Sequence, residues 1–215
     1  MIKITRFVFN PFSENTLLLV DEATHDAAVV DPGMSSDRER EIFDNYISDH
    51  SIKLTQIINT HLHLDHCFSD TYLAEKYSIP VLASEADEIY GKDLPSQMRH
   101  YGITDAKIQA VSITRKLKNG DIIEIGDSRL KVISVPGHTP GGLALYCKEQ
   151  DFVISGDSLF ETSIGRTDLP GGDHRTLIES IKKGLFTLPD NTTVIPGHGD
   201  TTTIGYEKKH NPYVC

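Results

Sequence analysis

The chain has 215 residues and a formal net charge of −10 at pH 7, with no run of basic residues. This charge disfavours a nucleic-acid partner, because phosphate binding relies on clustered lysine and arginine. The apolar runs are far shorter than the roughly 20 residues that span a bilayer, and the first residues lack the apolar stretch of a signal peptide. We therefore expect a cytoplasmic protein without membrane association.

Three widely spaced cysteines, Cys67, Cys147 and Cys215, are an odd set that disfavours a disulfide framework. This agrees with a reducing compartment. No Gly/Ser-rich linker, charge block or repeat divides the sequence. We therefore predict a single domain over residues 1–215.

The first third alternates short apolar runs with turn signals, which predicts strands. A helix follows, which Ser35 or Ser36 can cap and whose apolar residues recur at helical spacing as far as Ile47. The next strand ends where a cluster of histidines begins. The predicted strands of this region are Ile2–Phe9, Thr16–Val20, Ala27–Val30 and Lys53–Asn59.

Helices and strands then follow a second time. The predicted helices cover Cys67–Tyr77, Glu85–Tyr101 with an interruption at Pro95, and a segment from a capping Asp173 through Leu185. Strands are predicted at Ile79–Ala83, Ile122–Ile125, Leu130–Val135, Leu143–Cys147, Phe152–Ser155 and Thr193–Ile195. This order predicts an α/β protein of two sheets with helices outside.

The main chemical signal is the segment Thr60–His66, which holds three histidines and an aspartate. On an extended chain, residues i and i+2 face the same side, so His61 and His63 can reach one metal ion. If the chain then turns into a helix, Asp65 and His66 can reach a second one. Imidazole and carboxylate suit zinc, and also iron or manganese.

Three later segments each place one candidate ligand on a turn after an apolar strand. His138 lies in Val135–Gly141 and His198 in Val194–Gly199, both in a Pro-Gly-His pattern, and Asp157 follows Ser155-Gly156. Alone, each has an ordinary reading as a turn or cap residue. Together with the preceding cluster, they predict ligands held at one sheet edge.

These segments, in this order, resemble the metallo-β-lactamase superfamily over nearly the whole chain, including Val30–Gly33. The resemblance implies an αββα sandwich of two mixed sheets packed face to face, with helices outside. It also implies two divalent transition-metal ions, with zinc expected and iron or manganese as alternatives. His61, His63 and His138 would hold one metal, Asp65, His66 and His198 the other, and Asp157 would bridge them.

Within the superfamily, the sequence most resembles the glyoxalase II group, through Gly137–Gly141, Gly156–Phe160 and Gly165–Asp168. The C-terminal segments Thr202–Lys208 and Asn211-Pro212 resemble its short bacterial branch, which lacks the helical C-terminal domain. The implied activity is hydrolysis of thioesters such as S-lactoylglutathione, a small glutathione-derived substrate. Because the missing domain supplies much of the glutathione pocket, glutathione specificity is open.

A hydrolytic mechanism follows from such a site. Two metal ions would share a water and lower its pKa toward ~7, so that the hydroxide attacks the carbonyl. Asp65 and Asp157 are the candidate catalytic carboxylates, and Asp31 is either an orienting residue or a turn aspartate. Arg166 either binds substrate or forms a surface ion pair with Asp168.

Other activities fit the same residues. Persulfide dioxygenases share the fold, the histidine order and a Gly-Arg-Thr-Asp segment, and use one iron held by the equivalents of His61, His138 and Asp157. A lactonase needs the same metals as a thioesterase. A metal-stabilised scaffold fits poorly, because seven ligands exceed a closed four-ligand structural site.

Overall fold

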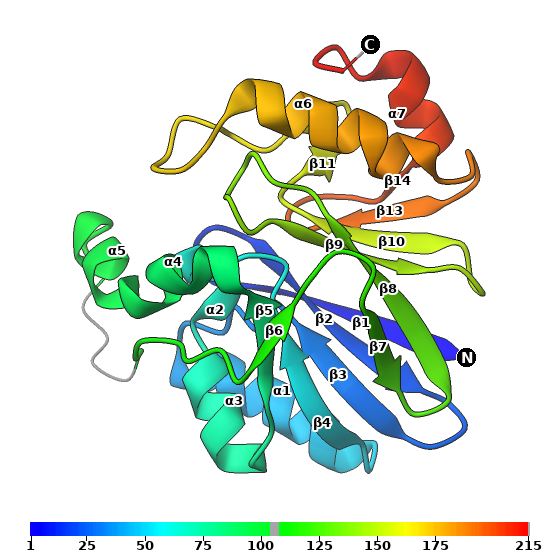
Figure 1. The fold of residues 1–215 in the computed structure, drawn as a ribbon. Helices are drawn as coiled ribbons and strands as arrows, with labels where there is room; N and C mark the ends of the chain where they lie inside the picture. The colour runs from blue at the N-terminus through cyan, green and yellow to red at the C-terminus, as the bar shows by residue number, and fades with distance from the viewer. Residues whose placement is uncertain (104–107, 215) are drawn as a thin grey trace. The chain divides into compact units, whose positions relative to one another are not determined.

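The computed structural model describes residues 1–103 and 108–214 (Figure 1), so Cys215 lies outside the described residues. The chain divides into two compact units, Met1–Lys116 with Glu124–Ser128, and Leu117–Ile123 with Arg129–Cys215. A six-stranded mixed sheet forms the main part of each unit. Two mixed sheets with helices confirm the predicted α/β class, whereas a single domain over residues 1–215 stays a prediction.

The first sheet has the strand order β1-β2-β3-β4-β5-β6. The pairs β1–β2 and β2–β3 are antiparallel, and β3–β4 and β4–β5 are parallel. Since β3 and β4 are parallel, the residues that follow them lie at the same edge of the sheet. The strands are β1 (Ile2–Phe9), β2 (Glu14–Asp21), β3 (Asp26–Val30), β4 (Lys53–Ile58), β5 (Val81–Ser84) and β6 (Arg115–Leu117).

Helices cover one face of this sheet. Ser36 caps α1, as predicted, and Glu39 completes a capping box. Phe43 and Ile47 of α1 and Leu73 of α3 are buried in one apolar cluster with residues of β2, β3 and β4. The helical segments are α1 (Asp37–Asp49), α2 (Leu64–Cys67), α3 (Asp70–Tyr77), η1 (Glu85–Asp87), α4 (Glu88–Lys92) and α5 (Leu94–His100).

Two predicted helices differ from the observed ones. The helix predicted at Cys67–Tyr77 is in fact α2 followed by α3, because the backbone N–H of Ser69 donates to Pro32 O (3.0 Å) instead of continuing the helix. Pro95 does not interrupt a helix: it lies in the first turn of α5, where a proline costs no hydrogen bond. The break falls just before it, at Asp93.

The second sheet has the order β14-β13-β10-β9-β8-β7. β13 is parallel to β10, and β9 is antiparallel to both β10 and β8. Consequently β8, β10 and β13 run in one direction and their carboxyl ends share one sheet edge. The strands are β7 (Ile122–Ile125), β8 (Ser128–Ser134), β9 (Leu143–Cys147), β10 (Phe152–Gly156), β13 (Thr193–Pro196) and β14 (Thr202–Thr203), with a separate pair β11 (Leu159–Phe160) and β12 (Ser163–Ile164).

The helices α6 (His174–Lys183) and α7 (Ile204–His210) cover one face of this sheet (Figure 1). Asp173 caps α6, as predicted, by accepting a hydrogen bond from Thr176 N (2.7 Å). The prediction that α6 reaches Leu185 is wrong, because the helix ends at Lys183 and a 3₁₀ turn, η2 (Leu185–Thr187), follows. None of the described helices has the length and apolar character needed to cross a bilayer.

Candidate metal centre

The predicted histidine cluster lies directly after β4. His61 and His63 are on the extended segment that leads into α2, and Asp65 and His66 are on α2 itself. The ring centroids of His61 and His63 are 4.9 Å apart, and those of His61 and His66 are 4.1 Å apart. The structure therefore brings these four residues together, with all three histidines buried.

Asp31 fixes this segment from the neighbouring strand. It follows β3, whose register pairs Val30 with Ile58 at the end of β4. Asp31 Oδ1 accepts a hydrogen bond from Thr60 N (2.7 Å), and Oδ2 accepts one from the Thr60 hydroxyl (2.6 Å). Oδ2 also lies 3.0 Å from His66 Nδ1. This buried carboxylate therefore has three hydrogen-bond partners, one of them a predicted metal ligand, and its role in orienting that ligand stays a prediction.

These contacts determine which nitrogen of two histidines points toward a ligand. His66 Nδ1–H donates to Asp31, so Nε2 is the ring nitrogen that lies 3.8 Å from Asp65 Oδ2. The Thr60 hydroxyl gives its proton to Asp31 and can therefore only accept from His61 Nδ1, 3.1 Å away. In both rings Nδ1 makes the supporting hydrogen bond, which leaves Nε2 as the nitrogen that can bind a metal ion.

Close packing holds α2 against the start of the chain. Asn10 Nδ2 donates to both Gly33 O (2.9 Å) and Asp65 O (3.0 Å). A Cβ atom on Gly33 would lie 2.2 Å from Glu14 Oε2 and 2.4 Å from Asp65 O, so only glycine fits. Glu14 is fully buried here, and burial raises the pKa of its carboxyl group. The backbone of Asp65 is therefore fixed from two sides.

The second cluster comes from three strands of the second sheet. His138 follows β8, Asp157 follows β10 and His198 follows β13, and the three strand ends share one sheet edge. Gly197 N donates to Gly156 O (3.0 Å), which ties the last two turns together. The structure thus brings together three predicted residues that are up to 60 positions apart in the sequence.

Asp157 lies between the two histidines. Its Oδ2 is 3.6 Å from His138 Nε2 and 3.6 Å from His198 Nε2. A hydrogen bond between such atoms measures about 2.7–3.2 Å. Two donors bound at about 2.0–2.1 Å to one tetrahedral metal ion lie roughly 3.3–3.4 Å apart. The observed spacing is therefore closer to that of neighbouring metal ligands than to that of a hydrogen bond.

The orientation of His138 is fixed by the backbone of Arg166. His138 Nδ1 lies 2.7 Å from Arg166 O, and because a carbonyl can only accept, Nδ1 holds the proton. Nε2 then faces Asp157. Gly165 permits this approach: a Cβ atom there would lie 1.9 Å from Asp157 O and 3.1 Å from His138 Nδ1. The Gly165-Arg166 pair is therefore a structural support of this cluster.

The side chain of Arg166 points to a different partner. Its Nε and Nη2 donate to the two carboxylate oxygens of Asp168 at 2.7 and 2.8 Å. This bidentate pair holds the pKa of Asp168 at about 2. Both side chains are more than half exposed. The surface ion pair that the sequence allowed is therefore present, and the substrate-binding role of Arg166 stays a prediction.

Two of these supports were not predicted as functional. Thr60 directly precedes the histidine cluster but has no predicted role, and the prediction for Arg166 concerns its guanidinium, whereas its carbonyl is the group that contacts His138. A backbone acceptor leaves no trace in residue identity, so no sequence signal could have found it. The five histidines outside the motifs are all exposed; they are His25, His50, His100, His174 and His210.

Both clusters fit divalent metal ions by the chemistry of their donors. Each contains imidazole Nε2 atoms and a carboxylate, which suit zinc, iron and manganese alike. Three of the histidines, His61, His66 and His138, have Nδ1 held by an acceptor, which is the support that metal-binding histidines have. The fold and the clusters together define an α/β protein with a divalent-metal centre.

The family follows from comparison with known proteins. The chain matches the family model "Metallo-beta-lactamase superfamily" over residues 9–198, and it belongs to this superfamily. Among curated relatives, the hydroxyacylglutathione hydrolase GloC of Haemophilus influenzae is 34% identical over 205 residues, 94% of this chain and 93% of the relative.

Solved structures agree with this assignment. The BLEG-1 B3 metallo-beta-lactamase has a TM-score of 0.88 and 31% identity, with 99% of each chain covered. TTHA1623 in a di-iron-bound form has a TM-score of 0.85 and 32% identity, covering 97% of this chain and 99% of that one. ETHE1 from Myxococcus xanthus has a TM-score of 0.79 and 28% identity, covering 98% and 83%. These structural neighbours confirm the predicted fold class.

Proposed function

We propose that this protein is a metal-dependent hydrolase of thioesters, with hydroxyacylglutathiones such as S-lactoylglutathione as the first substrates to test. The observation that carries the substrate class is the 34% identity with a hydroxyacylglutathione hydrolase over 94% of the chain. Membership of the superfamily and the two His/Asp clusters support the metal-dependent chemistry. The substrate is a small molecule bound near these clusters.

The ligand set that we propose is the one that the family resemblance implies. His61, His63 and His138 would hold one metal ion, Asp65, His66 and His198 the other, and Asp157 both. We propose zinc, with iron and manganese as alternatives that the same donors accept; a similar structure contains two irons. When bound, the metal ions would act as Lewis acids and lower the pKa of a water molecule.

The residues of the chain contribute orientation and proton handling. Asp31 and Thr60 hold the imidazoles of His66 and His61 in the tautomer that presents Nε2. Asp65 Oδ2 lies 3.8 Å from His66 Nε2, where its carboxylate can orient a nucleophile and accept its proton. Asp157 has the same capacity between its two histidines.

The proposed reaction needs only water and the thioester. The water oxygen forms a bond to the acyl carbon, the C–S bond breaks, and the thiolate takes the electron pair of that bond. A thiol with a pKa of about 8.5 leaves easily without a strong general acid. This explains how a site whose carboxylates serve as ligands and bases can act on a thioester.

A direct assay tests this proposal. Metal-loaded protein should hydrolyse S-lactoylglutathione, as followed by release of glutathione, and removal of metal by a chelator should abolish the activity.

The competing activity is oxidation of glutathione persulfide by an enzyme with a single iron. The Gly165–Asp168 segment also resembles a segment of the persulfide dioxygenases. Oxygen uptake measured on the same preparation separates the two activities. If the metal-loaded protein leaves a panel of thioesters intact but consumes oxygen with glutathione persulfide, the hydrolase proposal is wrong.

A further inference from the structure

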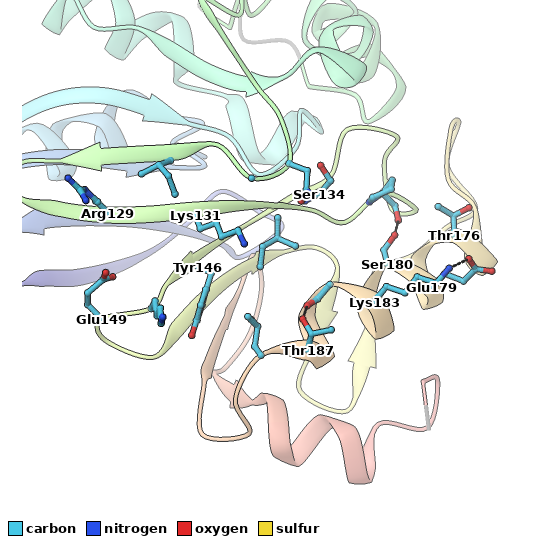
Figure 2. Close-up of a pocket in the computed structure, with 18 residues that line it drawn as sticks. Arg129, Lys131, Ser134, Tyr146, Glu149, Thr176, Glu179, Ser180, Lys183 and Thr187 are labelled. Atoms are coloured by element: carbon cyan, nitrogen blue, oxygen red, sulfur yellow. Dashed lines mark hydrogen bonds and ion pairs between the residues drawn. The ribbon is translucent and has the colours of Figure 1, made fainter.

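A groove of about 850 Å³ lies in the second unit, lined by β8, β9, α6 and the segment after α6 (Figure 2). This volume is within the roughly 300–1,000 Å³ of small-molecule sites. None of the candidate metal ligands lines the groove. It is therefore a feature that the proposed hydrolysis does not use.

The groove exists because α6 covers only part of its sheet face. Leu130 and Val132 of β8 are fully buried, whereas Arg129 and Lys131 alternate with them and are exposed. Toward the end of β8 the face is covered, since Ser180 Oγ of α6 donates to Pro136 O (2.8 Å). Toward its start, Arg129 and Lys131 line the groove. The groove therefore has one end against α6 and one end open along β8.

The lining is cationic in a strongly acidic protein. Four basic and two acidic side chains line it: Arg129, Lys131, Lys148, Lys183, Glu149 and Glu179. Glu179 is already balanced, because it accepts from Lys183 Nζ (2.9 Å) and Arg175 Nε (3.2 Å). The whole chain, by contrast, has a net charge of −10. An excess of positive charge at this point selects for an anion.

Two of the lysines carry this selectivity. No carboxylate in the described part of the chain lies within ion-pair distance of Lys131 or Lys148, and both are exposed. Lys131 pairs with Tyr146 across β8 and β9, Lys148 lies in the turn directly after β9, and both lysines line the groove. Figure 2 shows Arg129 and Lys131 toward one end of the groove and Ser180 and Thr176 toward the other.

The rest of the groove is apolar enough to hold a hydrocarbon. Ile133, Pro136 and Leu188 line the part near α6, and the ring of Tyr146, itself 8% exposed, forms part of the floor. We propose that this groove binds a small amphipathic carboxylate, with its charged end at Lys131 and Lys148 and its apolar chain along Ile133 toward α6. The charge complementarity and the mixed lining both favour this occupant.

The binding test uses the full chain and a fluorescent probe of the same chemistry, 1-anilinonaphthalene-8-sulfonate. The probe should bind saturably, and decanoate should displace it. Acetate, which has the charge but no chain, and decanol, which has the chain but no charge, should displace it at least tenfold less effectively. Equal displacement by acetate would overturn the proposal, because the apolar part of the groove would then contribute nothing.

Matched variants locate the site. The double variant Lys131→Glu with Lys148→Glu should weaken decanoate binding at least tenfold. Lys182→Glu with Lys209→Glu makes the same change of net charge at two exposed lysines outside the groove and should leave binding within twofold of the wild type. Neutral Lys131→Gln with Lys148→Gln should give an intermediate loss, and its thermal melting curve checks that the fold is retained.

The alternative occupant of this face is a second copy of the chain. Sedimentation of the same variants decides between the two. Decanoate binding that depends on Lys131 and Lys148, with no change of oligomeric state, supports the carboxylate site. If decanoate fails to compete and the Lys131→Glu, Lys148→Glu variant instead dissociates a dimer, the face is an interface between copies and the proposed site is wrong.

Discussion

The first cluster takes His61, His63 and His66 from one short segment after a single strand, whereas the second takes His138, Asp157 and His198 from the ends of three strands. In the first cluster, the Asp31 carboxylate holds the His66 ring directly through Nδ1 and the His61 ring indirectly through Thr60. In the second, the parallel alignment of β8, β10 and β13 determines the geometry. Local spacing thus builds one cluster and sheet register builds the other.

The two clusters should therefore respond differently to substitution. The first has supports beside its ligands, so loss of a support should weaken it by degrees. The second cluster has a single carboxylate, that of Asp157, between two histidines. Loss of this carboxylate should therefore abolish the contribution of the second cluster to thioester hydrolysis.

The largest effect is expected for Asp157→Ala. Asp157 Oδ2 lies 3.6 Å from both His138 Nε2 and His198 Nε2. Its removal should lower kcat/KM for thioesters by more than the roughly 100-fold that loss of an outer-shell partner reaches. Steady-state kinetics measures this. The exposed Asp127→Ala is the control, and a loss below tenfold for Asp157→Ala would show that the second cluster does not depend on it.

Asp31→Asn should have an intermediate effect. Asparagine tolerates the positive φ of this position (52°), but its amide nitrogen cannot accept the hydrogen bonds that the carboxylate accepts from Thr60 and His66. We expect metal affinity to fall by about 10- to 100-fold, as measured by competition with a chelator.

Asp26→Asn, at the other end of β3, is the matched control and removes only an ion pair with Lys53. An unchanged metal affinity in Asp31→Asn would mean that the histidine orientation is set by packing alone, and the contrast between the two clusters would lose its basis.

Arg166→Ala should have a smaller effect, confined to substrate binding. The carbonyl that orients His138 belongs to the backbone and stays in place. We expect KM for the thioester to rise about tenfold with kcat nearly unchanged, the pattern of lost uniform binding. Arg175→Ala, which also loses a surface ion pair, is the control. A drop in kcat that matches the rise in KM would place Arg166 in the reacting centre instead.

The smallest effect concerns the pKa of Asp168. The Arg166 side chain holds this pKa at about 2, below its ordinary value of 3.8. A depressed pKa means that the pair stabilises the fold fully above the ordinary value and loses this contribution as pH falls through about 2. In Arg166→Ala, an NMR titration should find the pKa of Asp168 raised from about 2 toward 3.8. A pKa of Asp168 that stays near 2 would mean that a backbone hydrogen bond, and not the Arg166 side chain, lowers it.

The same contrast explains what the sequence could predict. His61, His63, Asp65 and His66 stand within six positions, so their spacing alone predicts a metal site. His138, Asp157 and His198 are individually ordinary turn residues, and only their order and their resemblance to a family indicated a joint role. Their geometry comes from strand pairing, which residue identity does not encode locally.

Strands with a visible alternation or apolar run were also predicted better than the shortest strands. The strands Ile2–Phe9, Ile122–Ile125 and Leu143–Cys147 match their predicted bounds, because alternation or an apolar run is visible over several residues. The break between α2 and α3 was missed, because a hydrogen bond from Ser69 N to the distant Pro32 O causes it. Strands of two or three residues, such as β6, β11, β12 and β14, show too little pattern to be predicted.

Metal content directly reports whether the two clusters bind two metal ions per chain. Metal-replete protein should contain two transition-metal ions per chain by elemental analysis, and His66→Ala should retain one. His100→Ala, at an exposed histidine outside both clusters, should retain both. A single ion in the wild type, with the content unchanged in His66→Ala, would rule out a two-metal centre and favour the mononuclear iron enzyme.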